Sequence, residues 1–349
     1  VQLTTQPEEA LIDNRAGVAG SDTRVALSAY SMDRNPERNE AALTALQKHP
    51  LVRAILPPVL LELTDDSSVP RSDEDTTPVS VPARQDQSIY PVVGVIDSGV
   101  SSVLDGWVVG RFDYLSPGEY DTAHGTNVAG LLTIGQTLNS PAVAPEANGC
   151  LLFDIPLYPS GSFMARYPRG FSDFLEEIEQ AVAEARSERG VRVFNLSINA
   201  VAPVDRHRYS IYASRLDQIA DTYGVIFVNS AGNLAPSQSR SPWQKRPADV
   251  VSYFASRTSP DTIFKPAESV RSISVGALNP PGTLQIEDAP TVYTARGPGL
   301  QVGVKPDVAF YGGTGGVAPG ASTGLSSLSP LGIKRDVVGT SFAAPLVAR

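Results

Sequence analysis

From residue 90 onward, short apolar runs bounded by turn residues alternate with segments of helical periodicity. The apolar runs include 90–97 (YPVVGVID), 149–158 (GCLLFDIPLY) and 191–198 (VRVFNLSI), and a helical pattern such as that of 173–188 lies between them. A strand that is apolar along its whole length is buried on both faces, and helical crossovers make successive strands parallel. The pattern predicts an α/β fold, a parallel sheet with helices on both faces. Functional groups are then expected at the carboxyl ends of the strands.

The N-terminal part of the chain has a different character. Residues 24–32 alternate as a strand does, a helical stripe follows over 37–49, and 51–63 reads as extended chain. We therefore expect residues 1–63 to form a small α+β domain. Residues 64–88 are acidic, rich in Ser, Thr and Pro, and almost free of large apolar side chains, which predicts a linker. The larger α/β domain would occupy 89–349.

Charge and cysteine content exclude several classes of protein. The net charge is −9, which argues against a broad nucleic-acid or anionic-membrane surface, and no apolar run approaches the roughly 20 residues that span a bilayer. We expect neither a nucleic-acid nor a membrane partner. Cys150 is the only cysteine, so no intrachain disulfide can form, and this favours a reducing compartment.

Two reactive side chains stand at predicted element boundaries. Asp97 ends the first apolar strand just before a Ser-Gly turn, where a carboxylate must be hydrogen-bonded or paired. It is either a turn cap or a catalytic group. His124 stands where a helix begins, beside Gly125. The other two histidines, His49 and His207, lie in the small N-terminal domain and in a charged segment, so His124 is the candidate general base.

A third and a fourth side chain complete the pattern. Ser341, in GTSFAAP, stands before a helix, where free N–H groups favour a developing oxyanion; a simple N-cap is the alternative. Asn233 follows a buried strand and could donate its amide to that oxyanion, or could be a turn residue. Together they predict nucleophilic acyl transfer, in which Ser341 attacks, His124 takes the proton and Asp97 orients the imidazole.

The blocks VVGVIDSGV, HGTNVAG, SAGN and GTSFAAPLVA, in this order, resemble the hallmark blocks of the subtilisin-like serine proteases, the subtilases. The resemblance covers about 90–349. It implies a subtilisin-like fold and a serine endopeptidase acting on protein or peptide substrates through an Asp97–His124–Ser341 triad. Asn233 would complete the oxyanion hole. Further matches imply a substrate-binding strand at Ser197, Ile198 and Asn199, and a wall of the primary specificity pocket at Ala231 and Gly232.

Residues 1–63 are similar in size and pattern to the inhibitory prodomain that subtilases often carry, which makes the linker 64–88 the expected site of autoprocessing; a non-inhibitory accessory domain is the alternative. No cofactor is required. The family's strong calcium site is in doubt, because the segment before VAPEA is shorter than the usual calcium loop.

The chain departs from the family in other ways. Asn199 and Ala200 replace the usual Gly-rich residues after the substrate-binding strand, and Asn127 stands where many members have a second histidine. Only eight residues follow Ser341, so we expect a C-terminal segment or a partner chain to be missing. The single cysteine, the absence of a signal-peptide pattern and the short loop favour a bacterial cytoplasmic protein, whereas the family's habits favour secretion.

Two other functions use the same residues. A catalytically silent, regulatory protein-binding module would keep the fold without the chemistry. A peptide ligase or cyclase would use the same triad but exclude water from the acyl-enzyme.

Overall fold

The computed structural model describes residues 2–3, 29–30, 36–48, 59, 61–62, 68–69, 78–85, 87–200, 202–243, 246–256, 261–300, 303–315 and 321–349. The chain divides into two compact units, Val1–Pro57 and Pro58–Arg349. The sequence reading placed the end of the N-terminal domain at residue 63. The division lies earlier because Leu61 and Glu62 pair with a strand of the second unit.

The first unit contains two short strands and one helix. Strand β1 (Gln2–Leu3) pairs antiparallel with β2 (Ala29–Tyr30), and helix α1 spans Pro36–Gln47. The helix overlaps the helical stripe expected over 37–49, and it begins one residue and ends two residues earlier. Most of the strand expected at 24–32 and of the extended segment expected at 51–63 lies outside the described residues.

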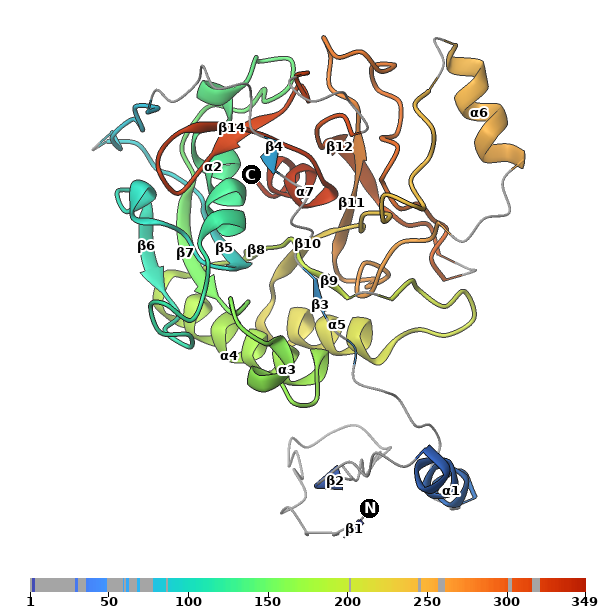
Figure 1. Cartoon of the computed structure of the whole chain (residues 1–349). Coiled ribbons are helices and arrows are strands. Elements are labelled where there is room, and N and C mark those ends of the chain that lie inside the picture. Colours follow the sequence, from blue (N-terminus) through green and yellow to red (C-terminus); the bar gives the residue numbers. More distant parts are fainter. Residues whose placement is uncertain are drawn as a thin grey trace. The chain divides into compact units, whose positions relative to one another are not determined.

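A seven-stranded parallel sheet forms the centre of the second unit (Figure 1). The strand order is β12-β11-β10-β8-β5-β7-β6, so β5 lies between β8 and β7. The bounds are β5 Val92–Asp97, β6 Val108–Arg111, β7 Leu151–Pro156, β8 Val193–Leu196, β10 Ile226–Ser230, β11 Ile273–Leu278 and β12 Val308–Tyr311. The α/β architecture expected from the apolar runs is confirmed.

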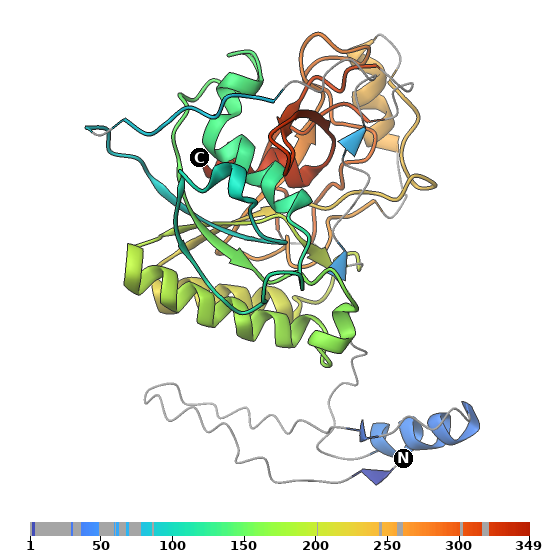
Figure 2. The same cartoon turned by 60° about the vertical axis from the view of Figure 1, so that its left-hand side comes forward.

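Helices cover both faces of this sheet. One core cluster joins Val93 and Val95 of β5 to α2 (Ala123–Leu138) and α7 (Thr340–Ala348). A second cluster joins Ile96 to α3 (Phe163–Arg166), α4 (Phe171–Arg189) and α5 (Ile211–Tyr223). Figure 2 shows α4 and α5 on one side of the sheet and α2 and α7 on the other. Alternate residues of one strand therefore enter different cores, as the pleat of a strand requires.

Two small sheets lie beside the large one. β13 (Ser326–Leu328) pairs antiparallel with β14 (Lys334–Val337), which also pairs with β4 (Ser68–Val69). β3 (Leu61–Glu62) pairs antiparallel with β9 (Asn199–Ala200). A one-turn 3-10 helix, Ser102–Leu104, follows β5.

Part of the segment expected as a linker lies against the second unit. Val79 N donates to Gly332 O at 2.7 Å, and the side chain of Val79 packs on the first core cluster. Trp107 Nε1 donates to Pro82 O at 2.9 Å. At least residues 78–82 of the expected linker therefore pack on the second unit.

An excursion of the chain between β10 and β11, residues 235–262, contains helix α6 (Pro247–Ser256). Both ends of the excursion are held by buried ion pairs: Arg240 contacts Asp261 at 2.8 Å, and Asp261 also contacts Arg296 at 2.8 Å. The Arg240 guanidinium in addition stacks on Phe254 of α6. These contacts join residues far apart in the sequence.

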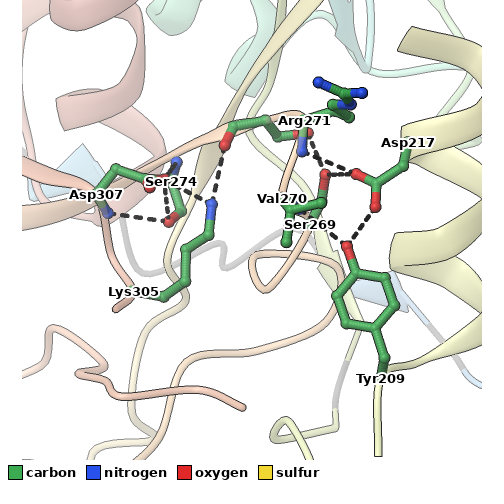
Figure 3. Close-up of polar contacts among 9 residues, drawn as sticks. Tyr209, Asp217, Ser269, Val270, Arg271, Ser274, Lys305 and Asp307 are labelled. Carbon is green, nitrogen blue, oxygen red and sulfur yellow. Dashed lines mark hydrogen bonds and ion pairs between the residues drawn. The ribbon is translucent and has the colours of Figure 1, made fainter. Parts of the chain in front are cut away.

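A polar network ties α5 to the amino ends of β11 and β12 (Figure 3). Asp217 of α5 accepts a hydrogen bond from Ser269 Oγ at 2.6 Å. Lys305 Nζ lies 2.7 Å from Asp307 Oδ2, which also accepts from Ser274 N. This network lies at the end of the sheet opposite the carboxyl ends of the strands. Among the helices that the structure describes, none is long and apolar enough to cross a membrane.

Candidate active site

The predicted reactive side chains lie at the carboxyl ends of neighbouring strands. Asp97 is the last residue of β5, and Asn233 follows β10 by three residues. His124 and Ser341 are the second residues of α2 and α7, the two helices that pack together on the same face. Because β10, β8 and β5 are adjacent, their ends bring these groups into one region.

Asp97 and His124 form a buried pair. His124 Nδ1 lies 2.7 Å from Asp97 Oδ1, and the two side chains are 5% and 0% exposed. Ser98 N donates to the same carboxylate oxygen at 2.7 Å. A carboxylate accepts hydrogen bonds, so Nδ1 carries a proton in this arrangement and Nε2 is the nitrogen that can accept one. Within the described part of the chain, His124 Nε2 and Asp97 Oδ2 have no hydrogen-bond partner.

The turn after Asp97 packs directly on the helix that carries His124. A Cβ atom on Gly125 would lie 2.2 Å from Gly99 O, so only glycine allows this approach. Gly125 N donates to Ser98 Oγ at 3.2 Å, and Ser101 N donates to Thr126 Oγ1 at 2.9 Å. These contacts fix the distance between the carboxylate and the imidazole.

The Ser341 hydroxyl is hydrogen-bonded to Ser197. Ser341 Oγ donates to Ser197 O at 3.1 Å, and Ser197 Oγ donates to Ser341 O at 2.8 Å. The His124 ring lies beside the next residue, with its centroid 5.3 Å from that of Phe342. Since Nε2 has no partner in the described chain, the serine hydroxyl must turn from Ser197 O to reach the imidazole. Such hydrogen bonds commonly form only when substrate is bound.

Asn233 is held in place by the residue before the serine. Its Oδ1 accepts from Thr340 N and from Thr340 Oγ1, both at 2.9 Å. Its Nδ2 lies on the Gly339 side, 3.3 Å from where a Cβ of that glycine would be. The amide donor therefore faces the turn that leads into Ser341. The Ser341 N–H belongs to the first turn of α7, so it makes no hydrogen bond to a carbonyl within that helix.

The residues expected to bind substrate flank Ser341. Ser197, Ile198 and Asn199 continue from β8, and Ala231 and Gly232 continue from β10. Gly232 N donates to Thr340 Oγ1 at 3.2 Å, which ties the second segment to the start of α7.

The edge expected to receive a peptide is paired with the chain's own residues Leu61 and Glu62. Leu61 stands opposite Ala200 and Glu62 opposite Asn199, in antiparallel register. Tyr158 OH donates to Leu61 O at 3.1 Å, and Phe171 N donates to Val59 O at 3.2 Å. The Leu61 side chain is 2% exposed and belongs to the core cluster beneath α3 and α4.

One buried acidic residue near the site was not recognised from the sequence. Asp154 lies within β7, and its side chain is fully buried on the same sheet face as Asp97. Its Oδ2 contacts Arg111 at 3.0 Å and accepts from Val100 N at 3.2 Å. Burial raises the pKa of Asp154 to about 7, whereas Arg111 and the Val100 N–H lower it. An aspartate inside the apolar run LLFDIP is the signal that could have pointed to it.

No cluster of three or more His, Cys, Asp or Glu side chains among the described residues is arranged to hold a metal ion.

Comparisons with known proteins concern the family and the fold of the chain. The model of the subtilase family matches residues 90–349. The uncharacterized protein y4bN of Sinorhizobium fredii (strain NBRC 101917 / NGR234) is 26% identical over 152 residues, which are 40% of this chain and 35% of that protein. The chain thus spans about a third of that relative's length.

Among solved structures, the chain is similar to the S41 psychrophilic protease, with 17% identity, 74% of each chain covered and a TM-score of 0.46. It is also similar to the epidermin leader peptide processing serine protease (EpiP) of Staphylococcus aureus. There the identity is 16%, the coverage is 75% of this chain and 64% of that one, and the TM-score is 0.46. The family match covers most of the chain, and this chain therefore belongs to the subtilase family.

Proposed function

We propose that the chain is a serine endopeptidase that hydrolyses peptide bonds through Asp97, His124 and Ser341. The observation that carries the proposal is the buried 2.7 Å contact between His124 Nδ1 and Asp97 Oδ1, beside a serine at the first turn of α7. Because Nδ1 is bonded to Asp97, the second imidazole nitrogen, Nε2, is the one that can accept a proton.

The proposed reaction proceeds in two stages. Ser341 Oγ attacks the carbonyl carbon of the substrate, and its proton passes to His124 Nε2. Asp97 stabilises the imidazolium, while Asn233 Nδ2 and the Ser341 N–H donate to the oxyanion. His124 then gives the proton to the departing amine, which leaves an acyl-enzyme. A water molecule, deprotonated by His124, releases the acid and restores the serine.

We further propose that the chain cleaves itself in the linker and that residues 59–62 occupy the substrate edge beforehand. The antiparallel pairing of Leu61 and Glu62 with β9 supports a peptide bound as an added strand. A peptide that continued this register by two residues would bring its carbonyl opposite Ser197, the partner of the Ser341 hydroxyl. In this chain the residue two positions after Glu62 is Thr64, so the proposed cleavage is between Thr64 and Asp65.

The pairing of β4 with β14 supports the same location. Ser68 stands opposite Val337 and Val69 opposite Asp336, and β14 leads directly to Gly339 and Ser341. The proposed bond thus lies between two chain segments that are anchored near the serine, one on its acyl side and one beside β14.

The test compares the chain with its Ser341→Ala variant. A fluorophosphonate probe is expected to label only the chain with serine, and intact-mass analysis is expected to find a fragment beginning at Asp65 only there. A full-length chain that neither labels nor cleaves would support the silent protein-binding alternative. Mass analysis of casein products separates hydrolysis from ligation, because a ligase yields joined peptides.

A further inference from the structure

The two chain segments that flank Ser341 separate just beyond the sheet. Strands β8 and β10 are paired up to Leu196 opposite Asn229. Beyond that pair, residues 197–199 continue toward the edge formed by β9, and residues 230–232 continue toward Asn233. We call these two stretches the flanking segments. The first is hydrogen-bonded to Ser341 and the second to Thr340, so both lie beside the proposed nucleophile.

A side-chain bridge joins the flanking segments. Asn199 Nδ2 donates to Ser230 O at 2.9 Å, and Ser230 Oγ donates to Asn199 Oδ1 at 2.6 Å. Both polar atoms of the amide are engaged, and Ser230 is completely buried. Moving Asn199 aside would leave buried polar groups unsatisfied, at a cost of about 1–3 kcal/mol each. The Asn199 side chain is therefore held in place between the flanking segments.

An aromatic side chain packs against the second flanking segment. Phe264 N donates to Ala231 O at 2.9 Å, which sets this residue beside the segment. A Cβ atom on Gly232 would lie 2.8 Å from both Cβ and Cγ of Phe264. Not even a methyl group fits between them, and Gly232 has a φ of +105°, which favours glycine. Phe264 therefore packs tightly on the second segment and leaves it no room to move toward the ring.

These contacts limit the side chain that can precede the cleaved bond. In the proposed reaction the oxyanion of the attacked carbonyl faces Asn233, and the substrate backbone follows residues 197–199. The side chain of the substrate residue before the cleaved bond is therefore directed between the flanking segments. We propose that Asn199, fixed by Ser230, and Phe264 restrict the enzyme to substrates with a small side chain at this position: Gly, Ala, Ser or Thr. The inference rests on the proposed peptidase function, and Thr64 belongs to this class.

The test uses peptidyl phosphonates that copy residues 60–64 and carry either an alanine or a phenylalanine side chain at the last position. Labelling of Ser341 by the alanine probe is expected to be at least about 100-fold faster, since a pocket that lacks the space discriminates by up to a few kcal/mol. Asn199→Gly and Phe264→Ala are each expected to lower this ratio by about tenfold or more. Leu284→Ala, at a site that is 81% exposed, is the matched control and should keep the ratio.

The outcomes separate the two proposals. Equal labelling by both probes, or a ratio that neither variant alters, overturns the size restriction while Ser341 remains reactive. A plain fluorophosphonate, which has no side chain to place, reports that reactivity on its own. If it fails to label folded chain after the linker is cut, the peptidase proposal is lost, and the size restriction with it. Two independent variants keep the test valid if one of them does not fold.

Discussion

Replacing Leu61 with alanine tests whether residues 59–62 compete with substrate for the edge at β9. The Leu61 side chain is 2% exposed, in a cluster that includes Ile198. Complete burial of a leucine side chain stabilises by about 1.5–3 kcal/mol, and the loss on truncation to alanine in a core is about 2–5 kcal/mol. The expected loss for Leu61→Ala is about 2 kcal/mol, the low end of the range for a core leucine.

A loss of about 2 kcal/mol raises the fraction of molecules with a vacant edge by about 30-fold, since 1.4 kcal/mol corresponds to a factor of ten. A free peptide that binds the same edge should therefore bind about 30-fold more tightly, as long as the edge is mostly occupied in the parent chain. The peptide keeps its own leucine, so only the intramolecular competitor is weakened.

The assay measures fluorescence anisotropy of a labelled peptide with the sequence of residues 57–64. All proteins carry Ser341→Ala, so nothing is cleaved. Leu284→Ala is the control and should leave Kd within about twofold, because an exposed leucine makes few contacts. A Kd that Leu61→Ala leaves unchanged would refute competition at this edge. Urea unfolding of both variants verifies that the fold itself is intact.

Three further predictions concern the site and its surroundings. Asn233→Ala should lower kcat on the order of 10²–10³-fold with little change in KM, the magnitude that loss of one oxyanion donor has in subtilisin itself, and steady-state kinetics measures it. The folded-state pKa of Asp154, about 7, lies above its ordinary value, so the stabilising effect of Asp154 is complete below about pH 4 and is lost as pH rises through 7. Asp154→Asn should therefore gain stability relative to the parent between pH 4.5 and 8, by about 4 kcal/mol at most, in urea unfolding; a difference that does not vary with pH would contradict this. Arg240→Ala should cost about 3–5 kcal/mol because it leaves the buried Asp261 with one partner fewer, whereas Arg169→Ala, at a half-exposed pair, should cost less than about 1 kcal/mol by the same measurement.

Much of the site could be located from short stretches of sequence. An apolar run that ends in a polar residue marks the end of a buried strand, and this placed Asp97 and Asn233 at strand ends. Small residues around His124 and Ser341 indicated helix starts with close backbone approach, and the 2.2 Å that a Gly125 Cβ would leave to Gly99 O gives the reason. Such signals are local, because backbone geometry depends on neighbouring residues.

The contacts of the site could not be derived in the same way. The bond from Ser341 Oγ to Ser197 O joins residues 144 positions apart, and the pair of Asp154 with Arg111 joins two strands. Which partners meet depends on strand order and helix packing, which no local window contains.

The amino-acid sequence by itself determined the parallel sheet, the family and the positions of the reactive groups, because hydrophobic periodicity and residue size act over a few neighbouring residues. Only the tertiary structure decided that residues 61–62 cover the edge at β9, that Asn199 is tied to Ser230, and that α6 is held by Arg240 and Asp261. Each of these depends on polar or apolar groups from distant segments being buried together, where an unpaired hydrogen-bonding group or an empty space is costly.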